Sequence, residues 1–173
     1  MGHGIAAAAL VTATGCILPL DLSVGEFDAG RGAPPVITDQ VTPEEFRFSG
    51  PISVERNDPR IFSLTLSDND IDDVLFVRMF VDYSASAPTN FLSDCTAPPN
   101  GNFERQASCL AGRLCDPVAQ TDTGIHALDV MVSDGEFLST GDAEAAGQPP
   151  FRAIPKGASA TIRTWLMECE NAQ

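Results

Sequence analysis

Two apolar runs joined by an acidic turn constrain the fold of this chain more than any other stretch. In residues 61–66, Phe62, Leu64 and Leu66 alternate with Ser and Thr, the two-residue period of a strand with one face in a core and the other in water. Residues 74–83 are apolar on one face and half apolar on the other, as in a strand near the middle of a packed sheet. These runs predict two paired strands joined by a turn at residues 67–73.

Three other segments have strand patterns. Residues 125–132 and 158–169 read as strands, although the second leaves open which of its faces is buried. Residues 46–54 alternate on either side of Gly50 and Pro51, and a proline inside a strand places that strand at a sheet edge. Short strands separated by turn signals, with no helical repeat after residue 16, predict an all-β, two-layer antiparallel sandwich.

Residues 84–124 form a long segment with little periodicity that contains three of the five cysteines. A structureless loop of this length is uncommon inside a compact domain, so we expect short strands or disulfides to order it. Long ordered loops on rigid sandwiches often carry binding, which makes this segment the predicted partner-binding region.

Two short motifs resemble those of a known class. Residues 130–135, Val-Met-Val-Ser-Asp-Gly, resemble the penultimate strand of cadherin-like and other immunoglobulin-like modules of bacterial surface proteins. The acidic turn at residues 68–73, followed by Val74 and Leu75, resembles the same modules. The resemblance implies an immunoglobulin-like β-sandwich over residues 43–173.

The N-terminus has the features of an export signal. Residues 5–13 are small and apolar, but nine residues are too few to cross a hydrocarbon core of about 30 Å as a helix. Residues 13–16, Ala-Thr-Gly-Cys, resemble the lipobox of bacterial lipoproteins, in which a small residue precedes an invariant cysteine. The chain departs from that family in having Ala13 where Leu is usual and no Lys or Arg ahead of Ile5.

The lipobox resemblance implies a signal peptide over residues 1–15 and a lipidated Cys16 that anchors the protein in a membrane. More than one acyl chain on this cysteine would give stable anchoring. Ile17 and not Asp follows the cysteine, which in this family favours the outer membrane of a Gram-negative cell envelope. The alternatives are a secretory peptide cut elsewhere and a buried N-terminal helix.

Residues 16–42 are predicted to be a flexible tether, because they are rich in Gly and Pro and show little periodicity. The formal charge of −14, from 24 acidic against 10 basic residues, repels phosphate backbones and anionic lipid headgroups. We therefore expect no nucleic-acid partner, and membrane contact only through the lipid. The acidity favours cationic partners or serves solubility alone.

The four later cysteines, Cys95, Cys109, Cys115 and Cys169, are expected to form two disulfides, because an exported chain meets an oxidising compartment. Spacing leaves all three connectivities open. We favour Cys109 with Cys115, closing a short loop, and Cys95 with Cys169. A zinc site is disfavoured because the sequence has no Cys-x-x-Cys pair.

Asp68, Asp70 and Asp72 have the alternation of oxygen ligands found in calcium loops. An EF-hand is excluded, because residues 73 and 79 are not the Gly and Glu that it needs. A cadherin-like calcium site would form if Asp134 and Glu136 approached the same end of the sandwich. The simpler interpretation, which we favour, is a solvated turn whose side chains bond their own backbone.

Candidate catalytic residues are scarce. His126 is the one histidine beyond the signal segment, and the sequence has neither Gly-x-Ser-x-Gly nor a phosphate-binding loop. Its ring is expected to pack at a strand start with one nitrogen bonded. The chain is therefore predicted to be a non-enzymatic structural or protein-binding module without a required cofactor. The alternatives are a calcium-stiffened adhesion module and an enzyme of unknown type.

Overall fold

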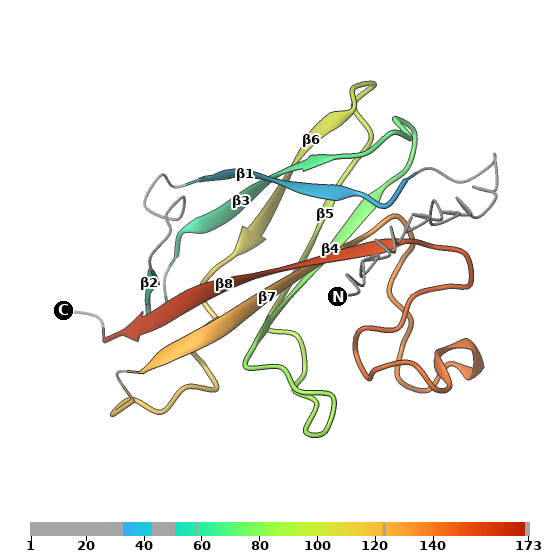
Figure 1. The fold of residues 1–173 in the computed structure, drawn as a ribbon. Coiled ribbons are helices and arrows are strands. Elements are labelled where there is room, and N and C mark those ends of the chain that lie inside the picture. The colour runs from blue at the N-terminus through green and yellow to red at the C-terminus, as the bar shows by residue number, and fades with distance from the viewer. Residues whose placement is uncertain (1–32, 43–50, 58, 123, 172–173) are drawn as a thin grey trace, which may run out of the picture.

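The computed structural model describes residues 33–42, 51–57, 59–122 and 124–171, with the backbone alone for residues 39–42. The predicted signal peptide, Cys16, and Phe46 and Phe48 lie outside these residues. The described strands, in chain order, are β1 (Val36–Thr42), β2 (Ile52–Glu55), β3 (Ile61–Ser67), β4 (Leu75–Val81), β5 (Ser93–Ala97), β6 (Glu104–Leu110), β7 (Ile125–Ser133) and β8 (Ala160–Glu170) (Figure 1). A short 3-10 helix, η2 (Ala143–Ala145), lies between β7 and β8.

The strands form two sheets that face each other, which confirms the predicted all-β sandwich. One sheet has the order β1-β3-β6 and the other the order β2-β8-β7-β4-β5. All neighbours are antiparallel except β2 and β8, which run parallel, so the expectation of purely antiparallel sheets was wrong for this edge. The prediction that β3 and β4 pair with each other was wrong, because the acidic turn carries the chain from one sheet to the other.

The strand order is that of an immunoglobulin-like sandwich. The third and sixth strands lie in one sheet, and the fourth, seventh and eighth strands lie in the other with Greek-key connections. The first two strands lie in different sheets, since β1 pairs with β3 and β2 pairs with β8. Pro51 directly precedes β2, which lies at a sheet edge as predicted.

Alternating side chains fill the space between the sheets. Phe62 of β3 is fully buried, and Trp165 of β8 packs on it edge to face with 6.3 Å between ring centroids. This contact settles which face of β8 is inside: Trp165 and Met167 point to the core, whereas Ile162 and Leu166 are about half exposed. β4 is an interior strand of its sheet, as its one apolar and one half-apolar face predicted.

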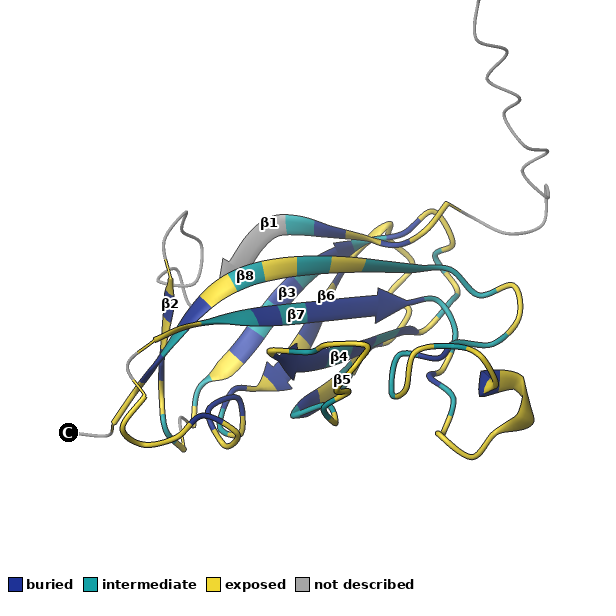
Figure 2. Cartoon of the chain, turned by 60° about the horizontal axis from the view of Figure 1, so that its bottom comes forward, coloured by how far each residue is buried: buried dark blue, intermediate teal, exposed yellow. Residues whose placement is uncertain are grey.

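A second apolar cluster lies on the outer face of the larger sheet, where residues 134–159 fold back over it (Figure 2). Phe137 from this excursion covers Phe80 and Met131, which the strands turn away from the main core. The guanidinium of Arg78 lies between the rings of Phe91 and Phe137, 4.4 and 4.6 Å from their centroids. Burial lowers the pKa of Arg78, and these cation–π contacts stabilise its charge in that setting.

Two predicted boundaries need correction. The tether was expected to reach residue 42, but β1 pairs with β3 over Val36–Thr42 and belongs to the sandwich. A shift of register between Ile37 and Val41 interrupts the strand, which explains why its two-residue period is not visible in the sequence. Residues 84–124 are ordered by strands and disulfides as expected, but β5 and β6 make them part of both sheets and not a single loop.

All four later cysteines form disulfides, but the favoured pairing was wrong. Cys95 of β5 pairs with Cys109 of β6, and Cys115 pairs with Cys169 of β8. The first disulfide joins the edges of the two sheets, and the second ties the segment after β6 to the last strand. In the chain-entropy model, loops of 14 and 54 residues stabilise the fold by about 3 and about 4 kcal/mol.

A tryptic digest without reduction tests this pairing, because the four cysteines fall on four different peptides: 79–105, 106–113, 114–152 and 164–173, apart from missed cleavages. The structure predicts that 79–105 is linked to 106–113 and that 114–152 is linked to 164–173, as read by mass spectrometry. A link between 106–113 and 114–152 would contradict the fold as described.

Candidate functional site

A buried arginine organises the acidic turn between β3 and β4. The alternation of β6 places Arg105 on its inner face, where it is only 2% exposed. The guanidinium donates hydrogen bonds to the backbone carbonyls of Asp70 and Asp73, and its Nη2 lies 3.4 Å from Oδ2 of the equally buried Asp68. Arg105 therefore supplies the positive charge that an otherwise anionic turn requires.

The predicted calcium ligands are used differently. Asp68 is paired with Arg105, Asp70 Oδ1 accepts the Asp72 N–H at 3.1 Å, and Asp134 Oδ1 accepts the Ser159 N–H at 2.7 Å. Among the described residues, no three His, Cys, Asp or Glu side chains lie close enough to hold a metal ion. The hydrogen bond from the Asp72 N–H to Asp70 Oδ1 is of the kind expected for a turn whose side chains bond their own backbone. The geometry gives the calcium-stiffened alternative no support.

The carboxyl groups of this turn are perturbed by burial and by each other. Burial raises the pKa of Asp68, against the opposing effects of backbone N–H groups and of Arg105. Burial also raises the pKa of Asp73, and the neighbouring charges of Asp70 and Asp68 add to the increase. The turn thus keeps an excess of negative charge even with Arg105 inside it.

Replacing Arg105 tests its role. Arg105→Met should lower the free energy of unfolding by about 3 to 5 kcal/mol, because it leaves Asp68 buried without its partner. Adding Asp68→Asn should recover part of the loss, as measured by urea denaturation. Arg113→Met is the matched control, since the Arg113–Asp116 pair is exposed and should be worth about 0 to 1 kcal/mol. Equal losses in the two arginine variants would contradict this role.

The raised pKa of Asp68 predicts a pH dependence. A carboxyl group whose pKa is higher in the folded state binds its proton more tightly there, so the free energy of unfolding falls as the pH rises from the ordinary Asp value, about 3.9, through the folded value. Asp68→Asn removes this group and should make the decline shallower in denaturation series from about pH 3 to about pH 7. An unchanged slope would show that Asp68 titrates normally.

His126 joins the end of β4 to the start of β7. Its Nδ1 lies 2.6 Å from Asp82 Oδ2, and Asp82 Oδ1 accepts the Ala127 N–H at 2.9 Å. On the other side Nε2 lies 3.9 Å from Asp122 Oδ2. The prediction of a ring packed at a strand start with one nitrogen bonded is confirmed, and the contacts hold two chain segments together.

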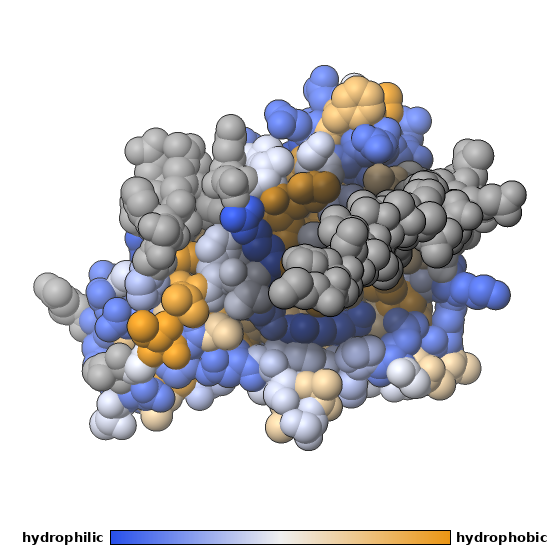
Figure 3. Space-filling view, viewed as in Figure 1, coloured by the Kyte–Doolittle hydropathy of each residue, from blue (hydrophilic) through white to orange (hydrophobic). Residues whose placement is uncertain are grey.

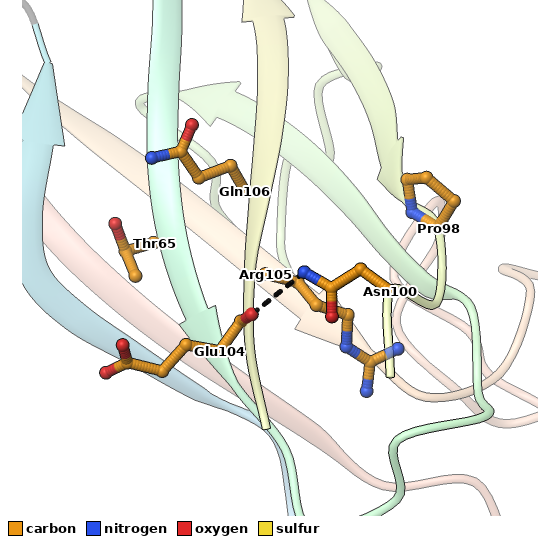
Figure 4. A pocket seen from close by; sticks show the side chains of 6 residues that line it. All are labelled: Thr65, Pro98, Asn100, Glu104, Arg105 and Gln106. Carbon is orange, nitrogen blue, oxygen red and sulfur yellow. Dashed lines mark hydrogen bonds between the residues drawn. The ribbon is translucent and has the colours of Figure 1, made fainter. Parts of the chain in front are cut away.

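A hollow of about 520 Å³ lies along β6, with Thr65 of β3 on one side of the strand and Pro98 and Asn100 on the other (Figure 4). Asn100 donates a hydrogen bond from Nδ2 to the backbone carbonyl of Glu104 at 3.1 Å. Its lining residues are Thr65, Pro98, Asn100, Glu104, Arg105 and Gln106.

The other end of β6 carries exposed apolar side chains. Ile61 of β3 and Leu110 of β6 are direct cross-strand neighbours, 50% and 66% exposed. Leu110 also lines a hollow of about 340 Å³, together with Leu92, Pro59 and other residues. On the face of the molecule shown in Figure 3, apolar side chains of the described residues gather in separate patches among hydrophilic ones. A paired, outward-facing apolar contact next to a hollow is suited to binding an apolar side chain of another protein.

The sequence pattern did not identify β6, because the buried face of this strand lacks large apolar side chains. The inward positions are Arg105, Ala107 and Cys109, so the buried face carries a charge and two small side chains in place of large apolar ones. The available signal was the alternation of these three with exposed residues. The predicted binding segment, residues 84–124, does contain β6, but most of that segment is structural.

No protein-family model matches the chain, and no curated protein matches it. Within the described residues, no helix is long and apolar enough to cross a membrane.

Proposed function

We propose that this protein is a non-enzymatic lipoprotein of the cell envelope, anchored by lipid on Cys16 in the outer membrane of a Gram-negative bacterium, and that its β-sandwich binds another envelope protein. The lipobox resemblance of residues 13–16 supports the anchor. The two disulfides support export, because such bonds form and persist in oxidising compartments.

The observation that carries the binding function is the exposed Ile61–Leu110 pair beside its hollow. Burying exposed apolar side chains against a partner removes them from water, and this is the main driving force of most protein association. Here the pair lies on a sheet that is held to the larger one by the Cys95–Cys109 disulfide, so it is presented on a rigid base. A rigid surface loses little conformational entropy when a partner binds.

A photo-crosslinking amino acid at position 110 tests this function in cells that produce the full chain. We expect one envelope protein to be crosslinked there, and much less at position 162, because Ile162 is also an apolar surface residue, 46% exposed, but lies on the other sheet. Cys16→Ser should release the protein from the membrane fraction and weaken the crosslink. Equal crosslinking at positions 110 and 162 would contradict a specific site.

A further inference from the structure

The hydrogen bonds that flank β6 fix the direction of its backbone groups. At one end the Asp68 N–H donates to the Phe103 carbonyl at 2.9 Å, and at the other the Ala111 N–H donates to the Arg60 carbonyl at 3.1 Å. In an antiparallel pair these bonds recur at every second residue. The odd-numbered residues of β6 therefore bond to β3, and the even-numbered ones turn their backbone N–H and C=O groups away from it.

The even-numbered residues of interest are Glu104 and Gln106, which alternate with the β3-bonded Arg105 and Ala107. The bond from Asn100 Nδ2 to the Glu104 carbonyl agrees with this assignment, because it reaches the carbonyl from the side away from β3 (Figure 4). Asn100 thus already bonds to the Glu104 carbonyl, which is one of the acceptors that a neighbouring strand would use. The Gln106 N–H and C=O have no such partner among the described residues.

Among the described residues, no strand pairs with the outer edge of β6, and Asn100 bonds to it at Glu104. β6 ends the order β1-β3-β6. β5 approaches it at Cys109, where the Cα atoms of Cys95 and Cys109 are 5.2 Å apart. Ahead of that point lies the 520 Å³ hollow, which is lined by Pro98 and also by Thr65 of β3. Its size is within the range of about 300 to 1,000 Å³ usual for ligand pockets.

The charge around this edge is negative. Glu104 is exposed, and so are Asp70 and Asp72 of the turn whose Asp68 N–H bonds to Phe103, the residue before Glu104. Arg105, the cation at this place, is buried with its guanidinium already bonded to the turn. Phe103, which directly precedes β6, is 61% exposed, and an exposed aromatic ring can bind a cation. These features are complementary to an extended segment that carries positive charge.

We propose that the outer edge of β6, residues 103–107, binds an extended basic segment of a partner protein as an added β-strand. Backbone hydrogen bonds to Gln106 would hold the strand, and basic side chains on its outward face would lie beside Glu104. The inference rests on the proposed protein-binding function and specifies how the partner is held. A second copy of this chain fits poorly as the added strand, because two surfaces with a formal charge of −14 repel.

The probe is a blocked heptapeptide of alternating Lys and Val, added to the full chain. Backbone amide exchange by NMR should slow at Gln106 by about tenfold or more at saturation, because its N–H becomes bonded, while Ala107, already bonded to β3, should change little. A peptide with Glu in place of Lys should bind at least about tenfold more weakly. A peptide N-methylated at every residue should not bind, since it cannot donate to a strand.

Two matched pairs of variants place the site. Gln106→Pro removes the outward N–H at an edge where proline is tolerated, and should weaken the Lys-Val peptide about tenfold, whereas Gln106→Ala should not. Glu104→Lys should weaken it similarly, whereas Glu170→Lys, an equally exposed change at the end of β8, should not. If Gln106→Pro fails to fold, the N-methylated peptide on the unaltered protein decides the same point.

Unchanged exchange at Gln106, or equal binding of the N-methylated peptide, would overturn strand addition. Equal binding of the Glu-Val peptide would overturn the preference for a basic segment. Crosslinking at position 110 reports on the proposed function independently. A partner captured there without peptide binding at Gln106 would leave the binding function standing and reject this mode of binding.

Discussion

The burial of Arg105 within the acidic turn is the interaction on which the rest of the sandwich depends. It joins β6 of the smaller sheet to the connection that enters β4 of the larger one, by way of two backbone carbonyls and Asp68. A buried charge is costly unless it is paired and hydrogen-bonded, so this corner has few alternative arrangements. The same guanidinium takes the place that a metal ion would have in a turn of this composition.

Two features follow from that arrangement. Because Arg105 points inward, its neighbours Glu104 and Gln106 must point outward, and their backbone groups face away from β3. The Cys95–Cys109 disulfide then joins the two sheet edges farther along β6, and no described strand pairs with the outer edge of its first half. A strand edge, an acidic surface and an exposed apolar pair thus lie along one element, on a scaffold fixed by covalent links.

The fold was predictable where the strands are regular. The periods of residues 61–66 and 74–83 identified β3 and β4, and the resemblance of residues 130–135 to a penultimate strand matches the place of β7. β1 and β6 were missed because an interrupted register hides one and Arg105 occupies the buried face of the other. The disulfide pairing was wrong because loop length says nothing of which sheet edges meet. The acidic turn was correctly located, but its cation came from a strand that the sequence pattern did not reveal.

The central claim is that this is an exported, lipid-anchored and disulfide-linked domain, and intact mass tests it most directly. The protein should be taken from the membrane fraction of its own host, and its intact mass should be measured by mass spectrometry before and after reduction. The account predicts a chain that begins at Cys16, carries added acyl mass and gains four hydrogen atoms on reduction, two for each disulfide. An unacylated chain that retains Met1 and free thiols would contradict the anchor, the compartment and the disulfides together.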